Sequence, residues 1–180
     1  MNSPDERRVR RRPGERSLLP TPVLISLDAM GGDHGPSVVV PGIREYIRRH
    51  GGENVRFLLH GDQTAIAAEM AKCKLTAEVC EIRHTDKVVA MDEKPATAMR
   101  RGKGSSLWNA VESVKSGEAG AVVSAGNTGA LMAISKLILR MSVADLERPA
   151  IVASWPTLRG ITAVLDVGAN IESEIGRAHV

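Results

Sequence analysis

The stretch Leu27-Asp-Ala-Met-Gly-Gly-Asp-His-Gly-Pro36 gathers residue types that can hold an anion. It follows an apolar run at residues 23–27, so the pattern predicts a strand that ends in a tight turn and feeds a helix. Glycines in such a turn let backbone N–H groups approach a ligand closely, and the helix start that follows favours negative charge. The candidate catalytic residues in it are Asp28 and Asp33, and the candidate phosphate or substrate ligands are Gly31, Gly32, His34 and Gly35.

Each of these residues also has a structural interpretation. The glycines can simply make the turn. Because a carboxylate repels phosphate, Asp28 and Asp33 would orient a cation, accept a proton, or cap the next helix, and for Asp33 capping and catalysis stay equally open. His34 is either a general acid or a solvated side chain.

A second loop of the same kind, Ser124-Ala-Gly-Asn-Thr-Gly129, also joins an apolar run to a helical pattern. Asn127 is a candidate catalytic residue that can point its amide at a phosphate or carbonyl oxygen. Thr128 is either a ligand or the N-cap of the next helix. Two such loops indicate a phosphate-handling enzyme. The further candidate ligands are Gly126 and Gly129 in this loop, with Asp166 and Asn170 in a third loop.

Residues 85–103 are predicted to be irregular and to carry cations that can close over an anion. Lys94 is a candidate catalytic residue, and Arg100 and Lys103 are candidate phosphate ligands. Arginine offers a bidentate fork to such a group. The alternative is a solvated run of charges.

Short apolar runs alternate with helical patterns along the chain. Such strands, separated by helices, indicate an α/β fold with a parallel sheet covered on both faces, whose ligands bind beyond the carboxyl ends of the strands. Asp62 is well placed as an N-cap, whereas Pro41 should kink its helix or delay its start. The predicted strands are 23–28, 55–60, 77–84, 119–124, 149–154 and 161–166, and the predicted helices are 37–50, 63–72, 105–116 and 128–141.

Composition narrows the function classes. Six arginines and three acidic residues in the first 16 positions account for the whole net charge of +3, so residues 1–20 are expected to be a disordered basic tail. The rest of the chain is neutral, which argues against a nucleic-acid partner, although a tail that binds RNA or membrane stays an alternative. Cys73 and Cys80 have no metal-site spacing and read as reduced cysteines of a cytoplasmic protein. No motif calls for a metal or another cofactor.

Four motifs together resemble the bacterial phosphate acyltransferases, also called acyl-ACP–phosphate transacylases. They occur in the order of that family and lie within residues 23–171, which we expect to be the N-terminal part of its catalytic domain. The motifs are Leu27-Asp-Ala-Met-Gly-Gly-Asp-His-Gly-Pro36, Lys94-Pro-Ala-Thr-Ala-Met-Arg100, Ser124-Ala-Gly-Asn-Thr-Gly-Ala130 and Leu165-Asp-Val-Gly-Ala-Asn170.

The resemblance implies a three-layer α/β/α, Rossmann-like enzyme, related in fold to phosphotransacetylases and isopropylmalate-type dehydrogenases. It implies transfer of a fatty acyl group from acyl carrier protein to inorganic phosphate, which feeds phospholipid synthesis. It also implies a cytoplasmic homodimer with peripheral membrane association. The alternatives are a phosphotransacetylase-like enzyme that uses acyl-CoA, or a remnant without catalytic activity.

Members of that family are about twice as long, so the chain is expected to be truncated and to have little activity by itself. Residues 172–180 are expected to be a non-native end, because 175–180 match a translated sequencing adapter.

Overall fold

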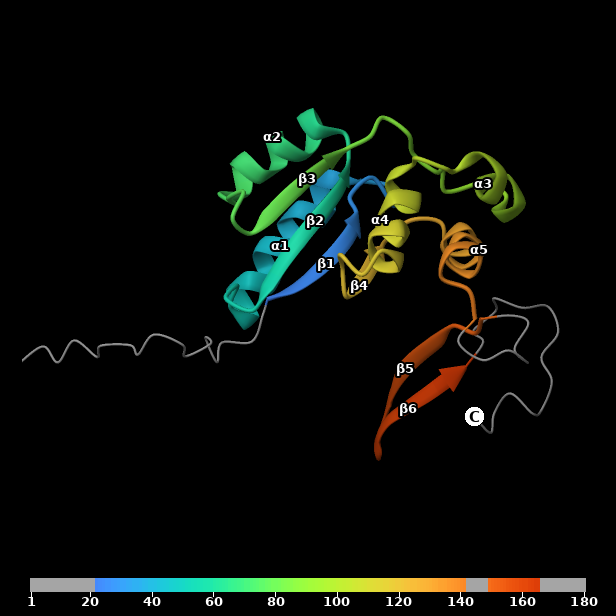
Figure 1. Cartoon of the computed structure of the whole chain (residues 1–180). Helices are drawn as coiled ribbons and strands as arrows, with labels where there is room; N and C mark the ends of the chain where they lie inside the picture. The colour runs from blue at the N-terminus through green and yellow to red at the C-terminus, as the bar shows by residue number, and fades with distance from the viewer. Residues whose placement is uncertain (1–21, 142–148, 166–180) are drawn as a thin grey trace, which may run out of the picture.

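The computed structural model describes residues 22–141 and 149–165 (Figure 1). The predicted basic tail at 1–20, the candidate ligands Asp166 and Asn170, and the end at 172–180 lie outside the described residues. In chain order the elements are β1 Val23–Asp28, α1 Pro36–His50, β2 Val55–Gly61, α2 Gln63–Cys73, β3 Cys80–His84, α3 Pro95–Arg101, α4 Ser106–Lys115, β4 Ala121–Ser124, α5 Thr128–Leu139, β5 Val152–Thr157 and β6 Gly160–Leu165.

The first four strands form one parallel sheet with the order β3-β2-β1-β4. All of their carboxyl ends therefore meet at one edge of the sheet, and the chain reverses its direction of growth between β3 and β4. In a doubly wound sheet, such a reversal opens the crevice in which ligands bind. The register places Asp28 between His60 of β2 and Ser124 of β4.

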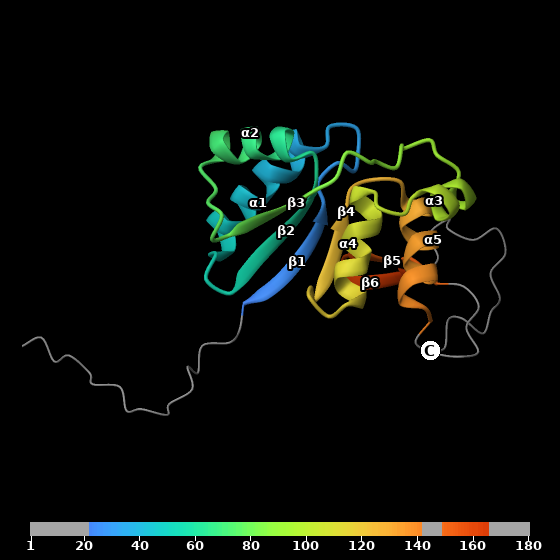
Figure 2. The same cartoon turned by 45° about the horizontal axis from the view of Figure 1, so that its top comes forward.

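Helices cover both faces of this sheet, as Figure 2 shows. On one face, α1 and α2 bury an aliphatic cluster against the first three strands, and on the other face α4 packs on the sheet and on α5. The predicted three-layer α/β/α architecture with a parallel sheet is thus confirmed. The first cluster includes Leu27, Val40, Ile43, Phe57, Leu59, Ile66 and Cys80; the second includes Leu107, Trp108, Val111, Ala130, Ile134 and Ile138.

The prediction of an irregular stretch at 85–103 is wrong for its second half, because Pro95–Arg101 forms α3. Pro95 occupies the first helical position, where the missing N–H costs nothing and the fixed φ suits a helix. Ala96, Ala98 and Met99 then supply high helix propensity. Ala98 is buried against α5 as part of the second cluster.

The last two strands do not join the parallel sheet. β5 and β6 form a separate antiparallel hairpin instead of two further strands of the parallel sheet. Only Leu158 and Arg159 connect them, and a parallel crossover needs about a dozen residues or more. The short spacing of the two apolar runs was the signal for this pairing.

The residues that precede α1 and α2 explain where these helices begin. Asp62 accepts a hydrogen bond from the Ala65 N–H, so the predicted N-cap of α2 is confirmed. The expected delay of α1 is wrong: the helix begins at Pro36, immediately after Gly35 with a φ of 49°, and runs through Pro41. A proline at the first helical position and a glycine that tolerates positive φ explain this early start.

Candidate functional site

The two glycine loops that follow β1 and β4 pack directly against each other. Ser124 Oγ donates a hydrogen bond to Asp28 Oδ2 at 2.8 Å, and the Gly126 N–H donates to Ser124 Oγ at 3.0 Å. A Cβ atom at Gly31 would lie 2.6 Å from Asp28 Oδ2 and 2.9 Å from the Gly126 nitrogen. Glycine is therefore required at position 31 because the second loop occupies the space of a side chain.

The contact continues at the next residue of the first loop and the preceding residue of the second. A Cβ at Gly32 would lie 3.0 Å from the Ala125 carbonyl oxygen, and Gly32 has a φ of 87°, which disfavours other residues. Sequence segments almost a hundred residues apart thus form one backbone surface at the carboxyl edge of the sheet.

Asp28 is the buried acid of this surface, with 3% of the residue exposed. Its Oδ2 atom accepts from Ser124, whereas its Oδ1 atom is buried and has no hydrogen-bond partner within the described chain. The Gly31 N–H lies 3.4 Å from the Asp28 carbonyl oxygen, and the Gly126 N–H donates to Ser124 Oγ, so both of these groups have other partners. A buried carboxylate oxygen normally accepts a hydrogen bond, so the lack of a donor at Asp28 Oδ1 from the described residues is unusual.

Several backbone N–H groups in the two loops make no hydrogen bond to the described residues. This arrangement provides donors for an oxyanion on both loops, next to the N-terminus of α5. These free groups include those of Gly32, Asp33 and His34 in the first loop and those of Ala125 and Asn127 in the second.

The side-chain amide of Asn127, a candidate catalytic group, makes hydrogen bonds within the chain at both its oxygen and its nitrogen. Its Oδ1 accepts from the Ala130 N–H at 2.9 Å and caps α5. Its Nδ2 lies within 3.2 Å of the carbonyl oxygens of Ala90, Met91 and Glu93. The amide thus ties the segment before α3 to the second glycine loop.

The alternative interpretation of Thr128 as the N-cap is wrong by one residue, because Asn127 precedes the helix with extended backbone and its side chain supplies the capping oxygen. Thr128 is exposed in the first turn of α5. Gly129 follows it, and a Cβ there would lie 2.8 Å from Pro95 Cγ. The start of α3 therefore packs on the start of α5.

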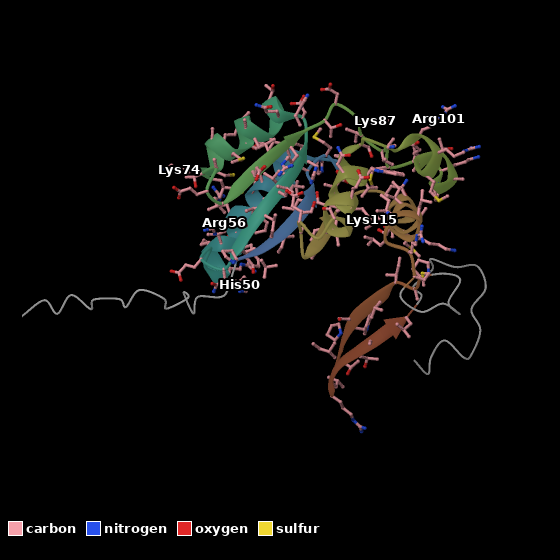
Figure 3. All side chains as sticks on the ribbon, in the orientation of Figure 1. His50, Arg56, Lys74, Lys87, Arg101 and Lys115 are labelled. Carbon is pink, nitrogen blue, oxygen red and sulfur yellow. The ribbon has the colours of Figure 1, made fainter. Side chains whose placement is uncertain are left out.

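This packing brings the predicted cations to the same end of the sheet. Lys94 directly precedes α3, Arg100 lies in its last turn, and Lys103 follows it; all three are exposed. None of them forms an ion pair within the described chain, and Arg100 Nε donates only to the Ala96 carbonyl at 3.3 Å. Figure 3 shows Lys87 and Arg101 at this end of the molecule and His50 at the opposite end of the sheet.

The other candidates of the first loop have different surroundings. Asp33 and His34 are exposed, and the His34 carbonyl accepts from Ser37 Oγ at 2.8 Å. Gly35 is the N-cap residue of α1 and makes no side-chain cap. Asp33 does not cap α1, so the capping interpretation of that acid is wrong.

The sequence places His60 and Ser124 at strand ends, where chemistry is expected, but assigns them no role in the site, and it does not select Ser113. Ser124 stands at a strand end, as Asp28 does, but its link to Asp28 depends on the order of the strands. His60 is buried, its Nε2 lies 3.3 Å from Ser113 Oγ, and its Nδ1 has no partner in the described residues. Burial is the main cause that lowers the pKa of the His60 imidazole to about 4; the Arg83 charge contributes to the lowering, and the Glu81 charge opposes it.

One cavity lies on the α4 side of the sheet and another on the α1 side. A polar one of about 320 Å³ lies over β2 and is lined by His60, Arg83, Asn109, Glu112, Ser113, Ser116 and Glu118. An apolar cleft of about 390 Å³ lies between α1 and the strands β1 and β4. It borders the glycine loops at Asp28 and Ala125, and its other lining residues are Ile25, Leu27, Val38, Val39, Gly42, Ile43, Tyr46, Phe57 and Val123.

Within residues 22–141 and 149–165, no three His, Cys, Asp or Glu side chains are grouped to hold a metal ion. No helix in this part of the chain has the length and apolar character needed to cross a bilayer.

Comparison with known proteins agrees with the four motifs. The model of the family described as fatty acid synthesis protein matches residues 23–177. Phosphate acyltransferase of Caulobacter vibrioides is 68% identical over 152 residues, which cover 84% of this chain and 41% of that protein. The corresponding protein of Phenylobacterium zucineum is 61% identical over 155 residues, covering 86% of this chain and 43% of the relative. That of Maricaulis maris is 57% identical over 148 residues, covering 82% and 42%.

The chain thus spans about two fifths of the length of the curated relatives that it matches. The match includes both glycine loops, the buried Asp28 between them and the segment that leads into α3. The chain therefore belongs to the fatty acid synthesis protein family.

Proposed function

We propose that this chain is part of an enzyme that transfers a fatty acyl group from acyl carrier protein to inorganic phosphate. The observation that carries the proposal is the meeting of the two glycine loops, which presents unpaired N–H groups beside a buried acid. The names of the relatives support the same reaction, since they are phosphate acyltransferases.

In the proposed reaction, a phosphate oxygen attacks the thioester carbonyl and displaces the thiol. The C–S bond breaks as the C–O bond forms, and the proton of the phosphate leaves with the thiol. Holding the phosphate beside the ester makes the encounter effectively intramolecular. Donors aimed at the developing oxyanion then stabilise the transition state.

The residues divide into three roles under this proposal. The N–H groups of Gly32, Asp33 and His34 and those of the second loop bind the oxyanions. Lys94, and with it the exposed cations Arg100 and Lys103, neutralises phosphate charge. Asn127 is a positioning residue, because both ends of its amide hold the loops in place.

The acyl chain is proposed to lie in the apolar cleft between α1 and β4. The cleft begins beside Asp28 and Ala125, so a chain within it would direct its ester toward the glycine loops. Burial of methylene groups there would contribute roughly 0.8 kcal/mol each.

Homodimer formation, peripheral membrane association and a cytoplasmic location are also proposals. Exposed apolar side chains outside the apolar cleft, including Leu137, Leu139 and Trp155, support a larger assembly than this chain alone. Cys73 and Cys80 are both unpaired, as in proteins of reducing compartments.

A chimera tests the activity directly. The chain would replace the matching segment of the Caulobacter vibrioides relative, to which it is 68% identical. We expect phosphate-dependent release of free thiol from acyl-ACP at a rate within about tenfold of the parent. Substitution Lys94→Ala in the chimera should lower this rate, whereas Lys72→Ala, on the outer surface of α2, is the matched control.

A folded chimera without thiol release would contradict the proposal. A preference for acyl-CoA over acyl-ACP would instead favour the phosphotransacetylase-like alternative. The isolated chain is expected to show little activity, since it spans about two fifths of its relatives.

A further inference from the structure

We infer that Asp28 selects phosphate over fully ionised anions by accepting a hydrogen bond from the P–OH group of the bound phosphate. The inference rests on the proposed function and names a specificity-determining residue for it. It goes beyond the general anion site, because N–H groups and cations alone would bind sulfate and phosphate alike.

The side chain is held in place on one side only. Ser124 Oγ donates to Oδ2, and the same oxygen is enclosed by Gly31 and Gly126. Oδ1 is buried, and none of the described donors reaches it. The carboxylate is thus oriented with one oxygen hydrogen-bonded to Ser124 and the other oxygen buried without a donor from the described residues.

The neighbouring groups show which kind of ligand suits this oxygen. Backbone N–H groups of Gly32 and Ala125 lie in the loops on either side and suit the ionised oxygens of an anion. A carboxylate among them repels any anion that cannot donate a proton to it. Inorganic phosphate carries a proton on oxygen at neutral pH and satisfies both kinds of group, whereas sulfate carries none.

The energetic effect follows from the burial of Asp28. An anion without a proton would leave a buried charged oxygen unpaired and face to face with negative charge, which costs more than an ordinary lost hydrogen bond. Sites built to bind a substrate O–H reject analogues that lack it for the same reason.

The experiment measures binding of phosphate, arsenate and sulfate to the 180-residue chain by isothermal titration calorimetry at pH 7 and constant ionic strength. Arsenate also carries a proton on oxygen and should bind like phosphate. Sulfate should bind at least about tenfold more weakly than phosphate. In Asp28→Asn, whose amide can donate to sulfate, the preference should fall to within about threefold.

Asp86→Asn is the matched control, because Asp86 is an exposed acid with 87% of its side chain accessible. It should keep the full preference for phosphate. Circular dichroism would establish that each variant is folded, and the selectivity of the unmodified chain tests the inference without any variant.

Sulfate binding within about threefold of phosphate in the unmodified chain would overturn the role of Asp28 and leave the proposed function standing. An unchanged preference in folded Asp28→Asn would do the same. Absence of binding of all three anions would overturn the proposed phosphate site and this inference together.

Discussion

The four-stranded sheet and the β5–β6 hairpin have similar sequence patterns but opposite surroundings. In the sheet, Leu58 and Leu59 are completely buried between layers. In the hairpin, Trp155 is 63% exposed and Ile161 is 79% exposed. Both regions are rich in β-branched and apolar residues, yet only the first has described elements on both sides.

The difference shows that strand formation and core formation are separate events. A two-residue connection suffices to pair β5 with β6, but a lone hairpin has nothing against which to bury its side chains. The parallel strands, in contrast, bring helices with them through their crossovers. The candidate site lies on the buried region, where its loops are held by contacts from several elements.

The largest difference in the free energy of unfolding is expected between alanine substitutions of two isoleucines, one in each region. Ile134→Ala in α5 removes a fully buried side chain and should lower the free energy of unfolding by about 2–5 kcal/mol. Ile161→Ala in the hairpin should change it by less than about 0.5 kcal/mol. Urea denaturation followed by circular dichroism measures both, and equal losses would show that the hairpin is buried in solution.

The second contrast concerns acid stability. The pKa of buried His60 falls from 6.5 to about 4 on folding, so the unfolded state binds more protons between these values. Stability should therefore rise with pH across this window and be lost as the pH falls from about 6.5 toward 4, by a total on the order of 3 kcal/mol.

His60→Gln should flatten this part of the pH profile of unfolding, whereas His50→Gln, on the exposed end of α1, should leave it as steep as before. The same pH profile in His60→Gln and the unmodified chain would contradict the assignment of the slope to His60.

The third contrast compares two glycines. Gly31→Ala forces a methyl group against Asp28, Ser124 and Gly126 and should destabilise the chain by about 1–3 kcal/mol and weaken phosphate binding. Gly42→Ala, with nothing within 4 Å and a helical backbone, should stabilise it by about 0.5–1 kcal/mol. Thermal melts and phosphate titrations check both; a neutral Gly31→Ala would mean that the two loops are not in contact.

The smallest expected effect concerns the Asn127 side chain, whose oxygen and nitrogen have separate roles. Asn127→Asp keeps the oxygen that caps α5 but loses the donor to Ala90, Met91 and Glu93, at a cost of about 1 kcal/mol. Hydrogen exchange should speed up at the Glu93 amide, which bonds to the Ala90 carbonyl. Asp62→Asn retains a cap oxygen on α2 and should leave that exchange unchanged. Unaltered exchange in Asn127→Asp would show that the amide does not hold this segment.

The local parts of the fold were predictable from the sequence. Apolar runs bounded by glycine, proline and polar residues mark β1, β2 and β4, because strands in the interior of a parallel sheet are apolar. The edge strand β3, Cys80-Glu-Ile-Arg-His84, is mostly exposed and has a weaker signal. The cap at Asp62 and the positions of both glycine loops were predictable for the same reason: each depends on neighbours within a few residues. The helix α3 was missed because its charged residues masked the proline and alanine signals.

The residue types of the site were predictable from the sequence, but the contacts between them were not. The sequence determined that glycine loops, acids and cations follow strand ends, and that parallel strands would gather them at one edge. Only the tertiary structure decided that Ser124 lies beside Asp28, that Gly31 contacts Gly126, and that the Asn127 amide faces the segment before α3. These contacts depend on the order β3-β2-β1-β4 and on its register, which arise from packing between distant segments and leave no periodic mark in the chain.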